Sequence, residues 1–328
     1  MEAYNIAIKV RNIISLLVFL GLIALVAASC QQHELCYDHN HYSNVLVTYD
    51  WQQEKDKPQS MFVYYYPEDG TQFLKRDFAG CMGGKTMIKT GLNHDIVSVN
   101  SDNPNLSLTK DMTPQTLTLK TEDAMVLSKL GLDISSLPVA PSSEGMPMRM
   151  ETGRVWIAAT SDRKVFAPFD KECVDTVVLT PTKAFVTYHI IINNVKNPQK
   201  ITSGIAASLS GLCGSIYPYT GQKTNEKVIV PFVLNLDIEK GVIDGSFTTF
   251  GKSLDENIPN KLVIYATLKD GSKWSYVFDV TSQIRKEVES DLVEVNINSL
   301  EIPNVPGSSS GMNPGIKGWN VIEIPVKM

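Results

Sequence analysis

Eight residues in the first half of the chain come close to the sequence of a phosphate-binding loop. They read Ala-Gly-Cys-Met-Gly-Gly-Lys-Thr over residues 79–86. A phosphate-binding loop begins with glycine and leads into a helix whose amino end faces the phosphates. Here Ala79 occupies the first position, and the residues after Thr86 are typical of a short strand and a turn. We therefore interpret the segment as a glycine-rich hairpin, with Gly83 and Gly84 in its turn, rather than as a nucleotide site.

A group of imidazole and thiol side chains near the amino end offers ligands for zinc or copper. Its members are His33, Cys36, His39 and His41. The residues around them are polar and typical of a flexible tether, which does not hold ligands in a fixed geometry, so we expect no metal site. The two other candidate bases, His94 and His189, are expected to be surface or packing residues.

Local motifs of catalysis are sparse. The sequence contains no HExxH zinc motif and no calcium-binding loop of the EF-hand type. The paired carboxylates of a glycosidase have no local signature, and nothing else in the sequence supports them. We expect a protein that is not an enzyme and that uses no cofactor.

The amino-terminal residues have the three parts of a secretory signal. Lys9 and Arg11 precede an apolar run over residues 13–26, which ends in small residues and then Cys30. A cysteine in this place resembles the bacterial lipoprotein signal, although the usual leucine three residues before the cysteine is Ala27 here. The resemblance implies cleavage before Cys30, acylation of Cys30 with chains such as palmitate, and a lipid-anchored place at the outer membrane, on the cell surface.

An uncleaved helical anchor is the alternative to lipidation. A run of about 17 apolar residues is at the short limit for crossing a bilayer, and the polar residues 31–34 follow at once. The formal net charge of −5 argues against a polybasic membrane patch and against nucleic acid, because both kinds of binding require a basic surface. We therefore expect membrane attachment through lipid and no nucleic-acid partner.

Four cysteines remain if Cys30 is lipidated. They are Cys36, Cys81, Cys173 and Cys213, and four cysteines allow three disulfide pairings, between which the sequence does not choose. Their scattered positions favour free thiols.

Alternating apolar residues and β-branched runs predict strands along most of the chain. The strands expected in the first half are 45–51, 61–66, 73–78, 85–89, 96–100 and 155–159. Those expected in the second half are 175–180, 185–193, 227–236, 262–268, 274–280, 293–297 and 321–326. A helix is expected over 122–130 behind a Thr121 cap, and a short helix within the small-residue stretch 201–214. Residues 135–152 and 303–318 are expected to be loops.

The length of the chain fits two ordinary domains. We expect a signal peptide over 1–29, a lipidated tether over 30–43, an N-terminal β-sandwich over 44–168 and a C-terminal β-sandwich over 169–328.

Several of these segments resemble the fimbrillin-like lipoproteins of Bacteroidales. The segments that carry the resemblance are 45–51, 61–70, 78–84 and 95–102 in the first half, and 179–182, 207–211, 268–271 and 278–281 in the second. The resemblance implies a mainly β fold with two tandem transthyretin-like Greek-key β-sandwich domains. It also implies a fimbrial subunit or an assembly accessory of the anchor type, whose partners are other fimbrial subunits and a surface receptor or glycan.

Two details refine this resemblance. Shaft subunits of the superfamily are matured by a trypsin-like cut near the amino end, whereas this chain has no Arg or Lys between Cys30 and Lys55. This favours a subunit that stays lipidated, although removal of the amino-terminal segment remains open.

The sequence Asp175-Thr176-Val177 resembles the short O-glycosylation signal of exported Bacteroidales proteins, which makes Thr176 a candidate glycosylation site.

The last strand is a candidate for strand exchange between subunits. The side chains of this strand alternate between two faces. Val321 lies on one face, and the other face carries Ile322, Ile324 and Val326. Pro325 predicts an edge strand, because proline cannot donate to a sheet ladder. An edge strand can join a neighbour's sheet through backbone hydrogen bonds, and ordinary pairing within the chain is the alternative.

The alternative function is a surface glycan-binding lipoprotein of a nutrient-uptake system. Such a module needs an exposed aromatic platform, and Tyr64–Tyr66 or the pair Trp274 and Tyr276 are the candidates for it. The alternating pattern of a strand sends half of such rings into the core.

Overall fold

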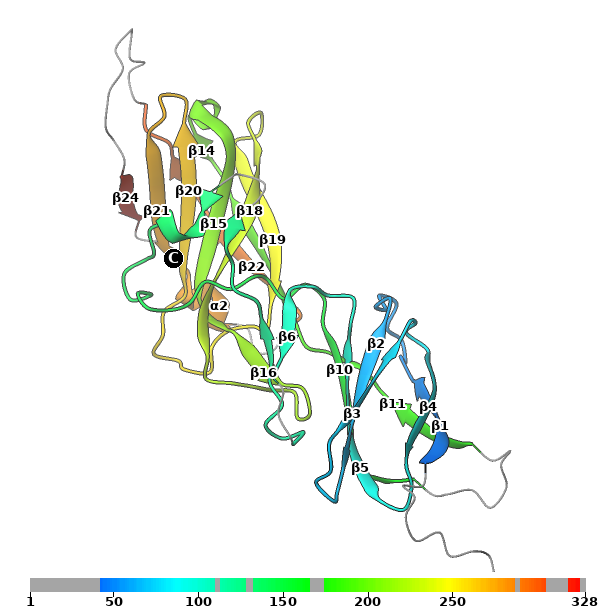
Figure 1. Ribbon diagram of the computed structural model, residues 1–328. Helices are drawn as coiled ribbons and strands as arrows, with labels where there is room; N and C mark the ends of the chain where they lie inside the picture. Colours follow the sequence, from blue (N-terminus) through cyan, green and yellow to red (C-terminus); the bar gives the residue numbers. More distant parts are fainter. Residues whose placement is uncertain are drawn as a thin grey trace, which may run out of the picture. The chain divides into compact units, whose positions relative to one another are not determined.

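The computed structural model describes residues 42–109, 113–127, 132–165, 174–286, 290–304 and 318–324. Strands dominate these residues, with one short α-helix and two 3-10 turns (Figure 1). The protein is therefore mainly β, as the sequence predicts, and its sheets pack as β-sandwiches.

The first sandwich pairs a three-stranded sheet, in the order β11-β1-β4, with a five-stranded sheet, in the order β12-β10-β5-β2-β3. Its strands are β1 (Tyr42–Tyr49), β2 (Met61–Pro67), β3 (Leu74–Phe78), β4 (Gly83–Lys89), β5 (Asn93–Asn100), β10 (Trp156–Lys164), β11 (Asp175–Leu179) and β12 (Thr182–Lys183). Aromatic rings fill its core. The ring centroid of Trp51 lies 6.0 Å from that of Tyr49 and 6.4 Å from that of Trp156.

The period-two pattern of β1 explains its position. Val45, Val47 and Tyr49 are buried in the first core, and the residues between them point to the other face. β1 pairs in parallel with β11 and antiparallel with β4. A strand with one apolar face is the structure that such alternation predicts. The strand expected over 45–51 is therefore confirmed, with ends that differ by a few residues.

The second sandwich is dominated by an eight-stranded sheet in the order β22-β13-β19-β18-β15-β20-β21-β24. Its strands are β13 (Val186–Ile192), β15 (Ile201–Cys213), β18 (Lys227–Asp237), β19 (Val242–Thr249), β20 (Lys261–Leu268), β21 (Lys273–Asp279), β22 (Leu292–Ile297) and β24 (Trp319–Ile324). The core contains a stack of three rings. The ring centroid of Phe247 lies 4.0 Å from that of Phe232 and 5.4 Å from that of Tyr188.

Smaller elements complete the fold. A four-stranded sheet combines β6 (Leu106–Leu108) and β7 (Leu119–Thr121) with β16 (Ser215–Tyr217) and β17 (Gln222–Lys223), and therefore joins segments far apart in sequence. The remaining elements are β8 (Val126–Leu127), β9 (Leu132–Asp133), β14 (Val195–Lys196), β23 (Leu300–Glu301), η1 (Ile134–Ser136), η2 (Pro198–Lys200) and α2 (Thr281–Lys286).

The helix expected over 122–130 is wrong. The backbone of Glu122 bonds to Asn105 and Met150, which lie on two other segments. Residues Val126–Leu127 form β8, which pairs with β9, and residues 128–130 lie outside the described part. A helix of nine residues is marginal on its own, and the extended backbone here gains partners that a helix could not reach.

The short helix expected within 201–214 is also wrong, because this stretch forms the long strand β15. Ile205, Ala207 and Leu209 face the main core, whereas Ala206 packs into a separate cluster on the opposite face. Small residues on both faces hide the alternation that marks a half-exposed strand.

The glycine-rich segment 79–86 is not a hairpin. It connects β3, which pairs with β2, to β4, which pairs with β1, so the turn passes from one sheet to the other. Gly83 and Gly84 lie within β4, not in the turn. The residues that follow the turn form the strand β4 and not a helix. The geometry of a phosphate-binding loop is therefore missing from this segment.

The division of the chain at residue 168 stays a prediction. β11 follows this point and pairs with β1 of the first sandwich, whereas β7 precedes it and pairs with β16. A domain boundary at this point therefore has to allow for one strand on each side of it that pairs with the other half of the sequence.

Candidate functional site at a sheet edge

The strand β24 lies at the end of the eight-stranded sheet (Figure 1). It pairs in parallel with β21, in a register that runs from Lys273 opposite Trp319 to Phe278 opposite Ile324. In the described part of the chain, β24 has no other strand as a partner. One edge of its backbone is therefore open, and the described residues show the edge position that the sequence predicts.

The side chains of β24 follow the predicted alternation. Ile322 and Ile324 are half-buried against the core of the second sandwich. Val321 points the other way and is 53% exposed. Pro325 and Val326 lie outside the described residues, so their part in the segment stays a prediction.

A further contact of β24 escaped the sequence analysis. The indole of Trp319 lies edge-on to Tyr265, with ring centroids 5.4 Å apart, and the Lys273 ammonium lies 5.7 Å from the centroid of the Trp319 ring. The sequence feature that could have indicated this contact is the aromatic residue at the start of a predicted edge strand. Trp319 is therefore the side chain that fixes the first residue of β24 on its sheet.

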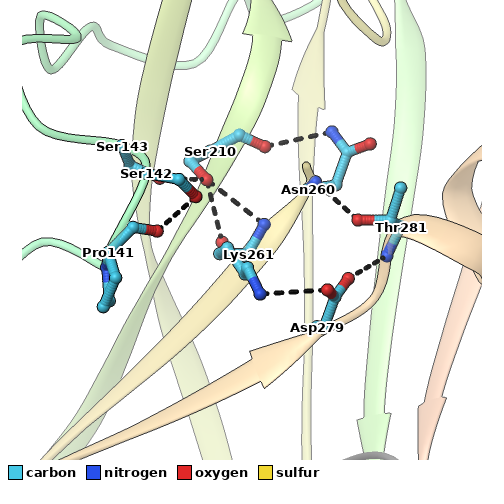
Figure 2. A network of polar contacts seen from close by, with 8 residues as sticks. All are labelled: Pro141, Ser142, Ser143, Ser210, Asn260, Lys261, Asp279 and Thr281. Carbon is cyan, nitrogen blue, oxygen red and sulfur yellow. Dashed lines mark hydrogen bonds and ion pairs between the residues drawn. The ribbon is translucent and has the colours of Figure 1, made fainter. Parts of the chain in front are cut away.

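The sheet that receives β24 is stiffened by a network of polar contacts (Figure 2). Lys261 donates to a carboxylate oxygen of Asp279 at 2.9 Å, which ties β20 to β21. Asn260 donates its side-chain N–H to the Ser210 carbonyl at 3.0 Å, and its backbone N–H to the Thr281 hydroxyl at 2.9 Å.

The loop over 135–152 is bound to the same sheet. The hydroxyl groups of Ser143 and Ser210 lie 2.8 Å apart (Figure 2). The Tyr265 hydroxyl donates to the Pro138 carbonyl at 2.8 Å, and burial raises the pKa of Tyr265 to about 12. The strands next to β24 are thus held from several directions, whereas β24, within the described residues, has backbone pairing with β21 alone.

The candidate modification sites lie in different places. Thr176 is exposed on β11, which is an edge strand of the three-stranded sheet. This position is open to solvent, as a glycosylated residue requires, and glycosylation itself stays a prediction. Cys30 lies outside the described residues, as do the tether residues His33, Cys36, His39 and His41.

The cysteines that the structure describes are free thiols. Cys81 is half-buried and Cys213 is buried. Burial raises the pKa of the Cys213 thiol above its ordinary value, which disfavours the reactive thiolate. Cys173 and Cys36 lie outside the described residues, so the pairing of those two is untested.

The two histidines in the described part of the chain, His94 and His189, lie on different strands. His94 is buried in β5, and burial lowers its pKa below the ordinary value. His189 is half-buried on β13. Within the described ranges, no group of three or more His, Cys, Asp or Glu side chains could hold a metal ion.

The aromatic residues proposed as a glycan platform are mostly core residues. Tyr65, Tyr66 and Tyr276 are buried. Tyr64 is half-buried and packs against Tyr66 at a centroid distance of 6.2 Å. Trp274 is half-buried, and its indole N–H donates to the Ser272 hydroxyl at 2.9 Å. These positions therefore do not form an exposed aromatic surface.

Among the residues that the structure describes, no helix has the length and apolar character needed to cross a bilayer.

Comparisons with known proteins add a family and a fold. The family model described as "Domain of unknown function (DUF5119)" matches residues 29–233. No curated protein matches the sequence. Of the solved structures, one described as a "putative adhesin" from Bacteroides ovatus ATCC 8483 has a TM-score of 0.58 and 14% identity, covering 80% of this chain and 95% of that chain. The fimbrial anchor protein Mfa2 from Porphyromonas gingivalis has a TM-score of 0.46 and 13% identity, covering 80% of this chain and 91% of that chain.

Proposed function

Because the chain belongs to the family described as "Domain of unknown function (DUF5119)", a description that names no activity, we propose a function from the fold and the edge strand. The protein is a non-enzymatic, cell-surface fimbrial subunit or anchor accessory. It is held to the outer membrane by lipid on Cys30 and joins neighbouring subunits through β24. Nearly full-length similarity of fold to a structure described as a putative adhesin supports this class of function.

The observation that carries the proposal is the weak attachment of β24. It is paired along one edge only within the described residues, and Ile322 and Ile324 are only half-buried. Residues 302–318 connect it to β23, and a connection of this length reaches at most roughly 60 Å when extended. This length would allow the strand to reach the sheet of a neighbouring subunit once its pairing with β21 and the contacts of Ile322 and Ile324 with the core are released.

Strand exchange explains how such a segment would join two subunits. Backbone hydrogen bonds to the receiving strand supply affinity, and alternate side chains that enter the core set the register. Ile322 and Ile324 are the side chains that would enter, since they face the core in the structure. A neighbour's β24 would occupy the edge that β21 presents once its own β24 has left.

Removal of the segment tests the proposal. A chain that ends at residue 318 should lose co-purification with other fimbrial subunits from the outer membrane. Its first sandwich should stay folded, as reported by fluorescence of the buried Trp51 and Trp156. If the truncated protein still brings down fimbrial subunits, or if it unfolds throughout, then β24 is only a structural edge strand.

The lipid anchor is tested separately. Replacement of the thiol in Cys30→Ala should release the protein from the membrane fraction, because stable attachment requires two or more acyl chains and the variant would carry none on this residue. Mass spectrometry of the parent should find an acylated peptide that begins at residue 30. A Cys30→Ala protein that sediments with membranes as firmly as the parent would contradict lipidation.

A further inference from the structure

A cavity of about 540 Å³ opens between β17, α2 and the loop that follows β19. This volume lies within the range of small-molecule sites, roughly 300–1,000 Å³. The cavity shares no lining residue with β24. Any ligand bound here would therefore add a property to the protein that the edge strand does not provide.

The lining of this cavity is basic. Among the described residues that line the cavity, Lys223, Lys252 and Arg285 contribute cationic side chains and Glu256 contributes a carboxylate. The whole chain carries a formal net charge of −5, so the cavity is positive within an acidic protein. A partly enclosed positive site attracts an anionic ligand more strongly than an open surface does.

Lys223 is held in place by a close approach to the backbone. Its ammonium donates to the carbonyl of Lys252 at 3.3 Å. Gly251 has a φ of +93°, and a Cβ atom at that position would lie 2.7 Å from the Lys223 ammonium. The positive φ favours glycine at 251, and a side chain there would have to displace the flexible end of Lys223.

Arg285 is held as firmly by the loop opposite. Its Nη2 atom donates to the carbonyls of Asp255 at 2.9 Å and Ile258 at 2.8 Å. These two bonds use both hydrogens of Nη2 and leave the Nη1 donors for another acceptor. In addition, the buried Nε donor has no acceptor among the described residues. The guanidinium is thus oriented in advance of binding, which reduces the entropy that a ligand must lose.

The loop between these two cations is fixed as well. Ser253 donates its backbone N–H to the Gly211 carbonyl at 3.0 Å. Lys227 pairs with Asp255 at 2.6 Å, so the charge of this neighbouring carboxylate is balanced. These contacts hold the loop in place without a ligand.

From this geometry we propose that the cavity binds a sugar residue that carries a carboxylate. The carboxylate contacts Lys223, Lys252 and the free donors of Arg285. Gln222 and Ser253, which also line the cavity, supply hydrogen bonds to hydroxyl groups, and Leu254 supplies an apolar side for the sugar's C–H face. The volume exceeds what an inorganic anion fills, which favours a ligand the size of a sugar.

Calorimetric titration of the full chain in detergent tests this assignment. The probes are glucuronate, its neutral counterpart glucose, and inorganic phosphate. Glucuronate should bind saturably, with an affinity that falls as salt rises, and should bind about tenfold or more tightly than either of the other two. Equal binding of glucose would overturn the role of the carboxylate, and equal binding of phosphate would overturn the role of the sugar. Lack of saturable glucuronate binding would overturn the proposal as a whole.

Three variants tie the binding to this cavity. The double variant Lys223→Gln/Lys252→Gln should weaken glucuronate binding about tenfold or more, whereas Lys240→Gln, at an exposed lysine outside the cavity, should leave it unchanged. Glu256→Gln should tighten binding, because it removes a carboxylate of the lining, and a gain of affinity cannot result from misfolding. Unchanged affinity in the double variant or in Glu256→Gln would place the ligand elsewhere.

Discussion

At the scale of single residues, Gly83 shows how one missing side chain allows two strands to meet. It has a φ of +90°, and a Cβ atom there would lie 2.1 Å from the Val47 carbonyl oxygen of β1. The positive φ and the close approach to Val47 each disfavour any residue other than glycine at position 83. The near match to a phosphate-binding loop is thus explained by packing, since this glycine lets β4 approach β1.

Gly83→Ala should therefore destabilise the first sandwich. A left-handed conformation costs a side-chain-bearing residue about 1–2 kcal/mol, and the collision with β1 adds to this. Gly70→Ala is a matched control, because Gly70 also has a positive φ but has no atom within 4 Å of the added Cβ. Urea unfolding should show the larger loss in Gly83→Ala. Equal losses in both variants would show that the close approach has no energetic effect.

Asp255 gives a prediction of pH dependence. The bond from the Lys227 ammonium, followed by one from the backbone of Asn257, holds the pKa of Asp255 below its ordinary value. A lowered pKa in the folded state stabilises the protein fully above the ordinary pKa, and this contribution is lost as pH falls through the folded value. Asp255→Asn should thus lower the urea midpoint at about pH 6, with a smaller effect at about pH 3.

Lys227→Gln provides the control for this pair. It should lose most of the pH-dependent contribution that Asp255→Asn loses, because the bond from Lys227 is the main cause of the lowered pKa, and the double variant should lose little more than Asp255→Asn. A difference from wild type that is the same at both pH values would contradict the role of the pair.

At the scale of elements, most long strands could be predicted from the sequence, whereas the segments 122–130 and 201–214 were wrongly predicted as helices and β19 (Val242–Thr249) was not predicted. Where one face of a strand is exposed, as in β1, alternation of side chains reveals it. β15 is covered on both faces, so its small residues carry no such pattern. The segment at 122–130 has residues that favour a helix, but its backbone bonds to distant segments decide its structure. In both cases the deciding partners are remote in sequence.

β24 should be the least protected strand of its sheet, and Trp319 should limit its opening. The aromatic and cation–π contacts of Trp319 are each worth about 0.5–1.5 kcal/mol. Trp319→Ala should therefore speed hydrogen exchange of the β24 amides about tenfold. Val321→Ala removes a side chain that is 53% exposed and should change exchange little. If Trp319→Ala leaves the exchange rates unchanged, the indole does not hold the strand.

At the scale of the whole molecule, the candidate site could be predicted only in part. The alternation of residues 321–324 and their edge position were readable from the sequence, since proline and turn-forming residues flank the strand. The parallel pairing with β21 was not readable, because it depends on how the chain returns to the sheet. The basic cavity was also hidden, because its cations come from β17, α2 and the loop after β19.

The central claim, that β24 leaves its own sheet to join a neighbour, is tested most directly by a reversible lock. Ser275 and Val321 are register partners on β21 and β24, so a disulfide in Ser275→Cys/Val321→Cys should keep β24 in place. After formation of the disulfide is verified by mass spectrometry, the tagged, locked protein should come from the outer membrane without other fimbrial subunits. Val321→Cys alone should bring them down as the parent does. Equal recovery of fimbrial subunits with the locked protein would contradict exchange of β24.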